Sequence, residues 1–591
     1  MAPPTRSIGR STLWLALSAC TGSPEGAAPP ETGEPDGGAA ACVEASYPAG
    51  PYGVSKGDVL EGRTLEGVRG DGARGAVRLS DSFASCGESR VLVVRVNAAF
   101  CGTCRASAER TASWLSPAMR ERVHVVDVVV RDEENAPPDV EGAVRWQARQ
   151  DVRTDVVVDP SMALVTTDAI LPRVLVVDPR TMRIREAMAD PAPEEIADAA
   201  LSVAAELRGE AALARRAVTR VDGRFTTVQW AMIQEMVLSG PPPKDPTNVH
   251  GDRPGAARFG RTLFDDKLLS PSGEVSCERC HEKHRSFTDG AETATGGVGG
   301  GTRNTPSVVL SAWSRWQLWD GRADTLWMQA LLPFEDPKEF GSSRLFVAHR
   351  IYDEYRDEYE ALFGPLPALD DAGRFPPNGK PGDPAWNAMA PGDRDAVTRV
   401  FVDVGKAIAA FERSFRVSPN ALDRYALGAR DALTVEQKDG LAAFFATGCA
   451  QCHWGPRLTD DAFHAMRFPS GHEDFTPDNG RIEAAAKYDA SEFRADGKWS
   501  DAKLPRRPLT AAPRLLGSFK TPPLRGVAVT PPYGHGGSVP FLSMAIELHR
   551  TRGRPEGDRF TIGAVDPWVV PFDAERTASL LAFVQTLGFS R

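Results

Sequence analysis

The sequence predicts a multidomain protein, with an α/β N-terminal domain followed by a mainly α C-terminal region made of two lobes. Its 591 residues exceed what one ordinary hydrophobic core organises. Apolar β-branched runs alternate with helical patterns between residues 91 and 207. The pentapeptides CERCH (277–281) and CAQCH (449–453) then place one motif in two separate parts of the remaining chain.

Composition indicates a soluble globular chain and argues against nucleic acid as a partner. Apolar residues make up 42% and charged residues 25%, and the net charge of −10 leaves no basic surplus to neutralise phosphates. No apolar run approaches the roughly 20 residues that span a bilayer.

The chain start has the parts of a secretory signal. Arg6 and Arg10 precede a short apolar run, Leu13 to Leu17, which is followed by small residues and Cys20. This ending resembles the bacterial lipobox, whose cysteine is lipidated; an ordinary signal peptide with an incidental cysteine is the alternative. We expect residues 1–20 to be removed.

The lipobox resemblance predicts the location of the mature protein. We expect it on the periplasmic side of the bacterial cell envelope, attached to the membrane only through lipid on Cys20. Thr21, where Asp would favour the inner membrane, favours the outer one. Residues 21–45 are rich in Pro, Gly, Ala and Glu and predict a flexible tether.

Export makes the nine cysteines informative. Cys20 is assigned to lipid, and three C-x-x-C pairs use six more. Cys42 and Cys86 remain, and a disulfide between them is expected, although both can also be unpaired.

The N-terminal domain begins with a strand that leads into C-x-x-C. Val91 to Val96 is a valine-rich apolar run interrupted only by Arg95, typical of a strand buried on both faces. It passes into Cys101-Gly-Thr-Cys104 and a helical pattern. A thiol at such a junction has a lowered pKa. Zinc would need two further ligands, which the neighbouring sequence lacks.

Further elements continue the βαβ pattern. Strands are predicted at 123–130 and 174–178, and helices near 140–150 and over 193–207. Residues 46–208 thus resemble the thioredoxin/redoxin superfamily. The resemblance implies a cis-proline at Pro172 facing the C-x-x-C.

The resemblance also implies that Cys101 is the attacking thiol and Cys104 the resolving one, acting on a thiol/disulfide partner protein. Phe100 stands where the family usually has Trp, so the redox potential and the partner do not carry over. A docking role is the alternative. Residues 209–249 are predicted as a linker, stiffened by prolines within 240–246.

C-x-x-C-H is the attachment motif of a c-type haem. Two thiols with two residues between them reach the two vinyl groups of one porphyrin, and the adjacent histidine becomes the proximal iron ligand. Two copies in an exported chain predict two covalent haem c groups, attached at Cys277 and Cys280 and at Cys449 and Cys452.

Several ordered blocks identify a family for this part of the chain. They are FGRTLFDDKLLSPSGEVSCERCH, GGTRNTPSVV, LWDGRADTLWMQALLPFEDPKEFG, AFERSFRVSPNALDRY, GCAQCHWGPRLTDDAFH and TPPLRGVAVTPPYGHGGS. From about residue 250 to the C-terminus they resemble the bacterial di-haem cytochrome c peroxidase/MauG family. Members are often homodimers and take electrons from a periplasmic donor such as a small cytochrome c or cupredoxin.

The resemblance divides the region and gives roles at the first haem. Residues 250–425, completed by 545–591, would form the peroxidatic domain, and 426–544 the electron-transfer domain. His281 would be the proximal ligand where hydrogen peroxide reacts. Gln329 and Glu339 match the distal pair, Trp319 the aromatic residue between the haems, and Arg322 a partner of a haem propionate or Asp320.

The resemblance also gives roles at the second haem and at a cation. His453 would be its proximal ligand. Asn304 and the carbonyls of Thr530 and Pro532 match the family's calcium site, and all three supply the oxygen ligands that a hard cation prefers. His464 and His535 would hydrogen-bond around the haems.

Two positions predict which branch of the family this is. The loop 293–300 reads ATGGVGGG and lacks the distal histidine of the classical peroxidases. His284 follows the proximal histidine too closely to replace it. The first haem is therefore expected to have an open coordination position, as in the MauG branch.

The sixth ligand of the second haem is expected at His549. The family places it seventeen residues after the calcium-site proline, and that count from Pro532 reaches His549. Met544 is the rival, one turn early on the same helical pattern.

The expected function is that of an exported di-haem peroxidase that reduces hydrogen peroxide and is fused to a thioredoxin-like module. The first alternative is a MauG-like enzyme that uses peroxide to oxidise a protein or small molecule. The second is a non-enzymatic electron-transfer or redox-sensing protein.

Overall fold

The computed structural model describes residues 44–87, 89–167, 169–211, 214, 216–470, 477–505, 507 and 512–589. Cys20 and Cys42 lie outside these residues, so the signal peptide, the lipid anchor, the tether and the Cys42–Cys86 pair stay predictions. Within the described part of the chain, no helix is both long and apolar enough to cross a membrane.

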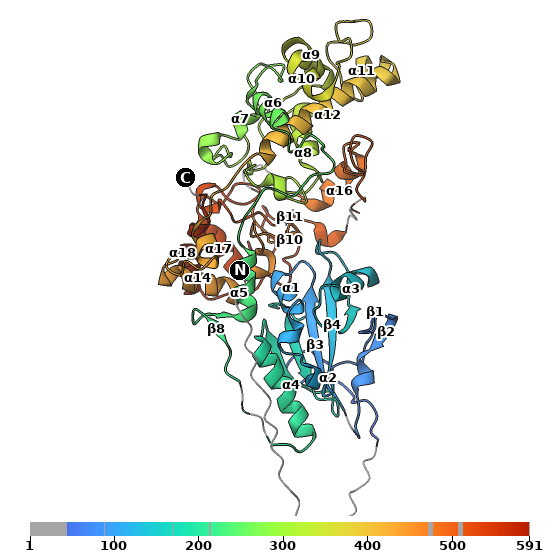
Figure 1. The fold of residues 1–591 in the computed structure, drawn as a ribbon, viewed down its shortest axis with the longest axis vertical. Coiled ribbons are helices and arrows are strands. Elements are labelled where there is room, and N and C mark those ends of the chain that lie inside the picture. The colour runs from blue at the N-terminus through green and yellow to red at the C-terminus, as the bar shows by residue number, and fades with distance from the viewer. Residues whose placement is uncertain are drawn as a thin grey trace, which may run out of the picture. The chain divides into compact units, whose positions relative to one another are not determined.

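The N-terminal domain is a seven-stranded mixed sheet in the order β2-β1-β5-β4-β3-β6-β7 (Figure 1). Its strands are β1 (Thr64–Val68), β2 (Arg74–Arg78), β3 (Val91–Ala98), β4 (Val123–Arg131), β5 (Asp155–Val158), β6 (Arg173–Val177) and β7 (Ile184–Ala189). Strands β3, β4 and β5 are parallel, and the pairs on either side of them are antiparallel. The sequence predicted β3, β4 and β6. It did not predict β5, although this inner strand is mostly apolar and buried, nor β1, β2 and β7 toward the two edges.

Alternate side chains of β3 explain why both faces of the sheet are covered. Val91 and Val93 pack into one hydrophobic cluster with Ile196. Leu92 and Val94 pack into another. The covering helices are α1 (Gly102–Ala108), α2 (Pro117–Arg120), α3 (Val140–Gln147) and α4 (Pro193–Leu207). A strand that enters C-x-x-C and a helix, within such a covered sheet, is the predicted thioredoxin-like fold.

The predicted linker 209–249 contains structure of its own. It holds the short strands β8 (Arg220–Val221) and β9 (Phe225–Thr226) and the helix α5 (Thr227–Glu235). Phe225, Met232 and Ile233 are buried in a cluster with side chains of the C-terminal region. Among the described residues of this segment, 216–219 and 236–249, which include the proline-rich part around 240–246, have no helix or strand. The segment is therefore largely a packed connection rather than a spacer.

The region of the first C-x-x-C-H is helical. Its elements are α6 (Pro254–Asp265), α7 (Cys277–Cys280), α8 (Leu326–Glu335), α9 (Arg344–Glu354), α10 (Arg356–Phe363), α11 (Pro384–Ala388) and α12 (Pro391–Arg413). The helix α12 crosses α6 and α8 where glycines allow it. A Cβ on Gly260 would lie 1.8 Å from the Ala407 carbonyl oxygen, and one on Gly405 would lie 2.7 Å from the Trp327 carbonyl oxygen.

The region of the second C-x-x-C-H is also mainly helical. Its elements are α13 (Ala421–Ala426), α14 (Val435–Ala446), α15 (Cys449–Cys452), β10 (Phe463–Ala465), α16 (Arg481–Ala490), β11 (Ser518–Lys520), α17 (Leu542–Arg550) and α18 (Arg576–Val584). The helices α14 and α18 pack closely at Gly440, where a Cβ would lie 1.9 Å from the Ser579 carbonyl oxygen.

This packing corrects the predicted role of the C-terminal segment 545–591. We had expected it to complete the first haem domain. Its apolar residues Ile546, Leu580 and Phe583 instead share a buried cluster with Phe444 of α14, in the second region. A short apolar helix packs on whichever face buries it, and the sequence alone does not say which face that is.

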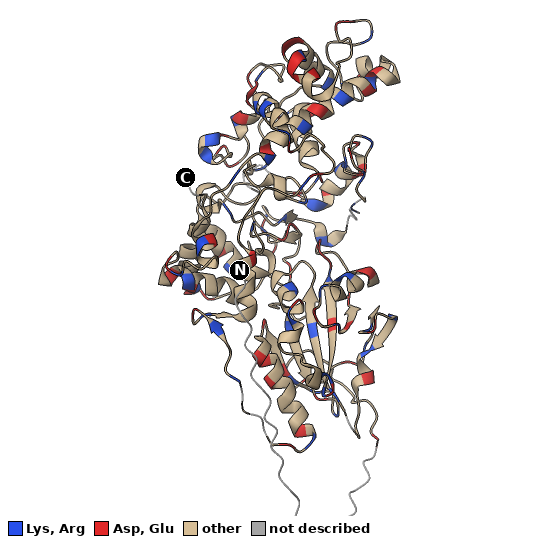
Figure 2. Cartoon of the chain, in the orientation of Figure 1, with Lys and Arg blue, Asp and Glu red and all other residues tan. Residues whose placement is uncertain are grey.

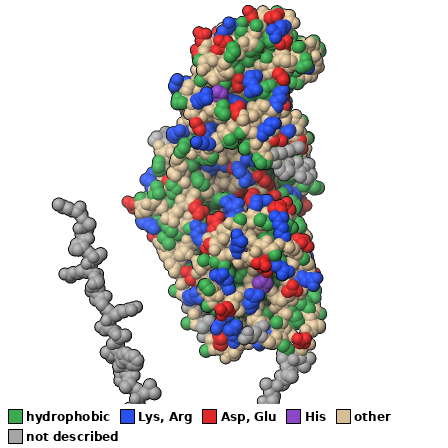
Figure 3. All heavy atoms as spheres, turned by 45° about the vertical axis from the view of Figure 1, so that its right-hand side comes forward, with side chains coloured by type: hydrophobic (Ala, Val, Ile, Leu, Met, Phe, Trp, Pro, Cys, Tyr) green, Lys and Arg blue, Asp and Glu red, His purple; other side chains and the backbone are tan. Residues whose placement is uncertain are grey.

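Charged side chains of both signs are interspersed along the described chain (Figure 2). On the face seen in Figure 3, hydrophobic side chains lie scattered among charged ones (Figure 3). This is the ordinary surface of a globular protein.

Candidate functional site

The two C-x-x-C-H histidines have matching local geometry. His281 Nδ1 lies 3.1 Å from the Phe287 carbonyl oxygen, and His453 Nδ1 lies 3.0 Å from the Leu458 carbonyl oxygen. A carbonyl only accepts, so each Nδ1 carries the proton and donates it. Each Nε2 is then left with a lone pair for a metal, which is how proteins orient a ligating histidine. Both motifs fit the proximal role.

The first motif opens onto a cavity of about 960 Å³. His281, Gln329 and Glu339 line it together with Trp319 and Arg322, although these residues come from separate stretches of the chain. Its size is at the upper end for sites that hold a cofactor. The structure thus brings together the residues that the family resemblance assigned to the first haem.

Glu339 is a half-buried carboxylate whose side chain makes no hydrogen bond with another described residue. Burial raises its pKa, and the nearby Asp336 adds to the rise, while Arg322 opposes it. The Gln329 side chain on α8 likewise has no hydrogen-bond partner among the described residues. Both polar groups are therefore free to bind a small polar molecule in the cavity.

The glycine-rich loop 293–300 holds the backbone at Glu339. Val298 N–H donates to the Glu339 carbonyl oxygen over 3.0 Å, and Gly299 N–H donates to the Lys338 carbonyl oxygen over 2.9 Å. A Cβ on Gly297 would lie 2.9 Å from the Glu339 Cα, so only glycine fits there. His284 is 74% exposed at its side chain and pairs with Glu282.

Charged residues anchor the wall of the cavity near Trp319. Arg303 and Arg322 contact Asp320 at 2.5 Å and 3.1 Å. Burial alone would raise the pKa of Asp320, but the two guanidinium groups lower it to about 2. Trp319 donates from its indole nitrogen to the Asn304 carbonyl oxygen over 2.9 Å.

Trp319 also links the cavity to the second region. Its carbonyl oxygen accepts a hydrogen bond of 2.8 Å from the backbone N–H of Lys520, the last residue of β11. The strand β11 pairs with β10, which follows the second C-x-x-C-H in the sequence. Trp319 therefore lies on a short hydrogen-bonded route from the first site to the second region.

The second motif faces His549 on α17. The ring centroids of His453 and His549 are 6.3 Å apart. An iron held about 2 Å from one nitrogen of each imidazole places the two centroids about 6 Å apart. His549 Nδ1 donates to the Ala545 carbonyl oxygen over 2.8 Å, which leaves its Nε2 for the metal. The pair fits a haem with two histidine ligands.

Met544, the rival for this role, lies on the surface. Its side chain is 46% exposed. Burial lowers the pKa of His453 to about 4, and His549 adds to the decrease. Burial also lowers the pKa of His549. Both imidazoles are therefore neutral near pH 7, the state in which they ligate iron.

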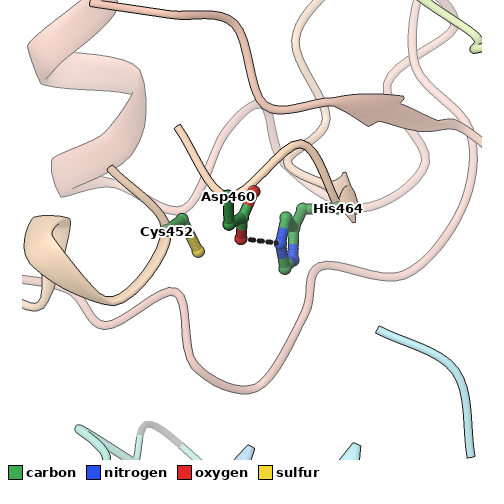
Figure 4. Close-up of side chains that lie close together, drawn as sticks. All are labelled: Cys452, Asp460 and His464. Carbon is green, nitrogen blue, oxygen red and sulfur yellow. Dashed lines mark hydrogen bonds and ion pairs between the residues drawn. The ribbon is translucent and has the colours of Figure 1, made fainter. Parts of the chain in front are cut away.

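His464 lies beside Asp460 and beside Cys452 of the second motif (Figure 4) and also contacts Asp566. Its Nε2 lies 2.9 Å from Asp460 Oδ2, and its Nδ1 lies 2.8 Å from Asp566 Oδ2. Burial alone would lower the pKa of His464. The charge that a free Cys452 thiolate would carry, which a thioether abolishes, and the two carboxylates raise the pKa well above the usual value.

The cluster of Cys452, Asp460 and His464 has the spacing of a metal site. Cys452 belongs to the haem motif, however, and a thioether with the haem uses its sulfur. Two ligands then remain, which are too few for a structural metal. We therefore interpret the cluster as hydrogen-bonded support beside the second haem.

The calcium site at Asn304, Thr530 and Pro532 stays a prediction, and the structure shows only what these segments contact. The Asn304 backbone N–H donates to the His535 carbonyl oxygen over 2.8 Å, which ties its segment to the chain just after Pro532. The Asn304 amide nitrogen donates to the Ala291 carbonyl oxygen over 2.9 Å, so its Oδ1 is free to accept or ligate. Thr530 uses its hydroxyl on the Gly526 carbonyl oxygen over 3.3 Å.

The C-x-x-C of the N-terminal domain forms a disulfide between Cys101 and Cys104. Both cysteines are 0% exposed. The Leu171–Pro172 bond is cis, and the Leu171 carbonyl oxygen lies 3.9 Å from Cys101 Sγ. The cis-proline and the disulfide therefore face each other, as the resemblance implied.

Sequence reasoning missed residues that contact the sites from a distance. Asp460, four residues before His464, is the one local signal among them. Asp566 is 102 residues from His464. Glu134, from the N-terminal domain, accepts a hydrogen bond of 2.8 Å from the Trp316 indole in the wall of the first cavity. No pattern in the sequence predicts such contacts.

Comparison with known proteins gives a consistent result. The model of the family described as "Di-haem cytochrome c peroxidase" matches residues 254–431. Methylamine utilization protein MauG of Methylorubrum extorquens is 30% identical over 380 residues, which are 63% of this chain and 90% of that one. Cytochrome c551 peroxidase of Nitrosomonas europaea is 27% identical over 335 residues, 56% of this chain and 79% of that one.

Solved structures also resemble the chain. A MauG-like protein associated with microbial copper homeostasis is 26% identical, with a TM-score of 0.44. The match covers 59% of this chain and 93% of that one.

Proposed function

This chain belongs to the di-haem cytochrome c peroxidase family, and from that membership we propose that it reduces hydrogen peroxide at the cavity beside His281. The family consists of haem peroxidase oxidoreductases with two c-type haems, and both C-x-x-C-H motifs here fit that cofactor. The observation that carries the proposal is the shared cavity of His281, Gln329 and Glu339.

The residues that hold the two haems follow from the geometry. Cys277, Cys280 and His281 would hold one of them. Cys449, Cys452, His453 and His549 would hold the other. Haem at the first site would supply the iron chemistry that activates peroxide, and haem at the second site would supply electrons.

Glu339 is the group that moves protons. Cleavage of the O–O bond requires a proton to leave the oxygen nearer the iron and to reach the departing oxygen. The Glu339 carboxylate takes the first proton and returns it to the far oxygen. Gln329 orients the peroxide by offering a donor and an acceptor on one amide. Because burial raises the pKa of Glu339, turnover should fall as the pH drops through that raised value.

Replacing the Glu339 carboxylate tests this role. We expect Glu339→Gln to lower kcat/KM for hydrogen peroxide by about 100-fold, the usual contribution of a general base. The exposed Glu274→Gln, near the same haem motif, is the matched control and should not change turnover. Both variants should keep two haems per chain. Peroxide turnover that survives Glu339→Gln with little loss would show that the distal assignment is wrong.

The alternative within the family is peroxide-dependent oxidation of a protein or small molecule. The glycine loop favours it, because the loop has no histidine to block the first iron and packs directly on Glu339. The source of the electrons that return the enzyme to its starting state separates the two functions. A peroxidase returns quickly to its starting spectrum when a reduced small cytochrome c is present. An enzyme of the alternative type keeps its altered spectrum until its own substrate is added.

The location, the donor and the calcium remain parts of the proposal. The signal-like start with Cys20 supports a lipid-anchored protein on the periplasmic side of the envelope. A small cytochrome c or cupredoxin of that compartment would then supply electrons. Asn304, with its Oδ1 free, and the carbonyls of Thr530 and Pro532 would bind calcium between the haem regions.

A further inference from the structure

The second haem motif lies in front of the N-terminal disulfide and its cis-proline. Gln451, between the two cysteines of CAQCH, accepts a hydrogen bond of 2.9 Å from the backbone N–H of Leu171. Leu171 precedes the cis-proline, and its carbonyl oxygen faces Cys101. The side of the module that presents the C-x-x-C is therefore occupied by this chain's own haem motif.

Trp454, the residue after His453, covers the C-x-x-C from the other side. A Cβ on Gly102 would lie 2.3 Å from the Trp454 ring, so the glycine of CGTC is what lets the indole approach. The Trp454 indole nitrogen donates to the Phe100 carbonyl oxygen over 2.8 Å. The Arg105 guanidinium lies 4.4 Å from the ring centroid.

The two cysteines of CAQCH pack in different places. Cys452 packs against the hydrophobic cluster that contains Cys101 and Cys104. Cys449 packs against a different cluster, in the second haem region. With Cys101 and Cys104 both 0% exposed, a separate protein cannot reach their sulfurs in this arrangement. The segment that contacts the C-x-x-C side of the domain is this chain's own haem motif, through Gln451 and Trp454.

We propose that the C-x-x-C of the thioredoxin-like domain is an internal reductant for Cys449 and Cys452, which keeps them as thiols until haem is attached. Thioether formation requires thiols, whereas an oxidising compartment closes neighbouring cysteines into disulfides.

The exchange balances without a further reagent. The Cys101 thiolate attacks Cys452 of a Cys449–Cys452 disulfide, so that a Cys101–Cys452 bond forms and Cys449 leaves as a thiolate. Cys104 then attacks Cys101, which forms the Cys101–Cys104 disulfide and releases Cys452. Two electrons and two protons pass to the haem-binding pair. Newly synthesised Cys101 and Cys104 are thiols, so each chain starts with one equivalent of reductant. The disulfide that they form is buried, which suits a reaction that occurs once per chain.

The first haem motif provides an internal control. Cys277 packs against the cluster of the first haem region, which contains neither cysteine of the CGTC motif. The internal reductant should therefore serve only the second haem.

The test is the haem content of the exported full-length chain with Cys101→Ser and Cys104→Ser together. We expect peptide mass spectrometry to find haem on residues 277–281 at the wild-type level and a several-fold loss on 449–453. Dithiothreitol added during maturation should restore the second haem. Restored protein should turn over peroxide as the wild type does, which separates this proposal from the peroxidase assignment.

Two outcomes would overturn the proposal. One is full haem at 449–453 in the double variant without added thiol. The other is a loss that dithiothreitol does not restore, because the serines would then have removed only a structural disulfide. Trapping is the second measurement. Cys104→Ser, produced while haem synthesis is blocked, should accumulate a Cys101–Cys452 disulfide, and its absence would likewise contradict the exchange.

Discussion

At the second haem motif, a single residue faces the proximal histidine where the first motif has open space. The ring centroids of His453 and His549 are 6.3 Å apart, while His281 faces a cavity lined by Gln329 and Glu339. The pentapeptides are therefore equivalent as attachment sites and different in what they leave open. The proximal histidines follow from the motif, but His549 could be predicted only by counting along a family pattern. Asp566 could not be predicted, because it reaches His464 across 102 residues.

The His549 assignment predicts a spectroscopic change. His549→Ala removes one axial ligand, and the second haem should change from a low-spin to a high-spin EPR signal. Met544→Ala, five residues earlier on the same helix and exposed, is the control and should leave the spectrum unchanged. If Met544→Ala changes the low-spin signal and His549→Ala does not, the two assignments must be exchanged.

The elements that position the first site were predictable where hydrophobic pattern or composition sets them. The strand β3 is mostly apolar, interrupted by Arg95 and Asn97, and α4 begins and ends where the sequence predicted. The edge strands β1 and β2 were missed because polar residues and glycines interrupt them. The helix α5 was missed because its apolar residues follow no single helical face, yet tertiary contacts bury several of them.

The glycine loop 293–300 predicts a contrast between two neighbouring substitutions. Gly297→Ala places a methyl group 2.3 Å from the Lys338 carbonyl oxygen, so the loop must move and shift the backbone at Glu339. We expect peroxide turnover to fall by about 10- to 100-fold, since a displacement near 1 Å has this effect on catalysis. Gly299→Ala meets nothing nearer than 3.4 Å and should be tolerated. Equal activities in stopped-flow assays of the two variants would refute the role of the loop.

The helix α12 carries a buried carboxyl group that predicts a pH-dependent stability. Burial raises the pKa of Glu412 to about 8, although the hydrogen bond from the Ser311 hydroxyl lowers it in part. Between about pH 4.5 and 8 the unfolded chain releases this proton and the folded chain keeps it. The free energy of unfolding therefore falls as the pH rises.

Glu412→Gln removes that dependence. The variant should match the wild type near pH 5 and be more stable at pH 8, on the order of 3 kcal/mol. Urea denaturation of the holoprotein at both pH values measures the difference. The exposed Glu354→Gln should have no such effect. A destabilised Glu412→Gln variant at pH 8 would mean that the carboxyl group is ionised and bound to an unrecognised cation.

At the scale of the whole molecule, the resemblances predicted both regions but not the contact between them. CGTC and CAQCH were each recognised as motifs, and nothing in the sequence indicated that Trp454 would lie on Gly102. Such a contact depends on the complementary shape of two surfaces, a glycine on one and an indole on the other. The contact changes how the CGTC motif is interpreted. An accessible thioredoxin-like disulfide suggests an external partner, and a covered one does not.

This cover predicts how the disulfide reacts in the finished protein. With both sulfurs buried, dithiothreitol can reduce Cys101–Cys104 only after the contact opens, so reduction should be slow. Trp454→Ala uncovers Gly102 and should speed reduction by about tenfold or more, measured by alkylation of the released thiols and mass spectrometry. Trp386→Ala, which removes a buried indole from the first haem region, controls for general loosening. If both variants react at the wild-type rate, Trp454 is not what closes the disulfide to external thiols.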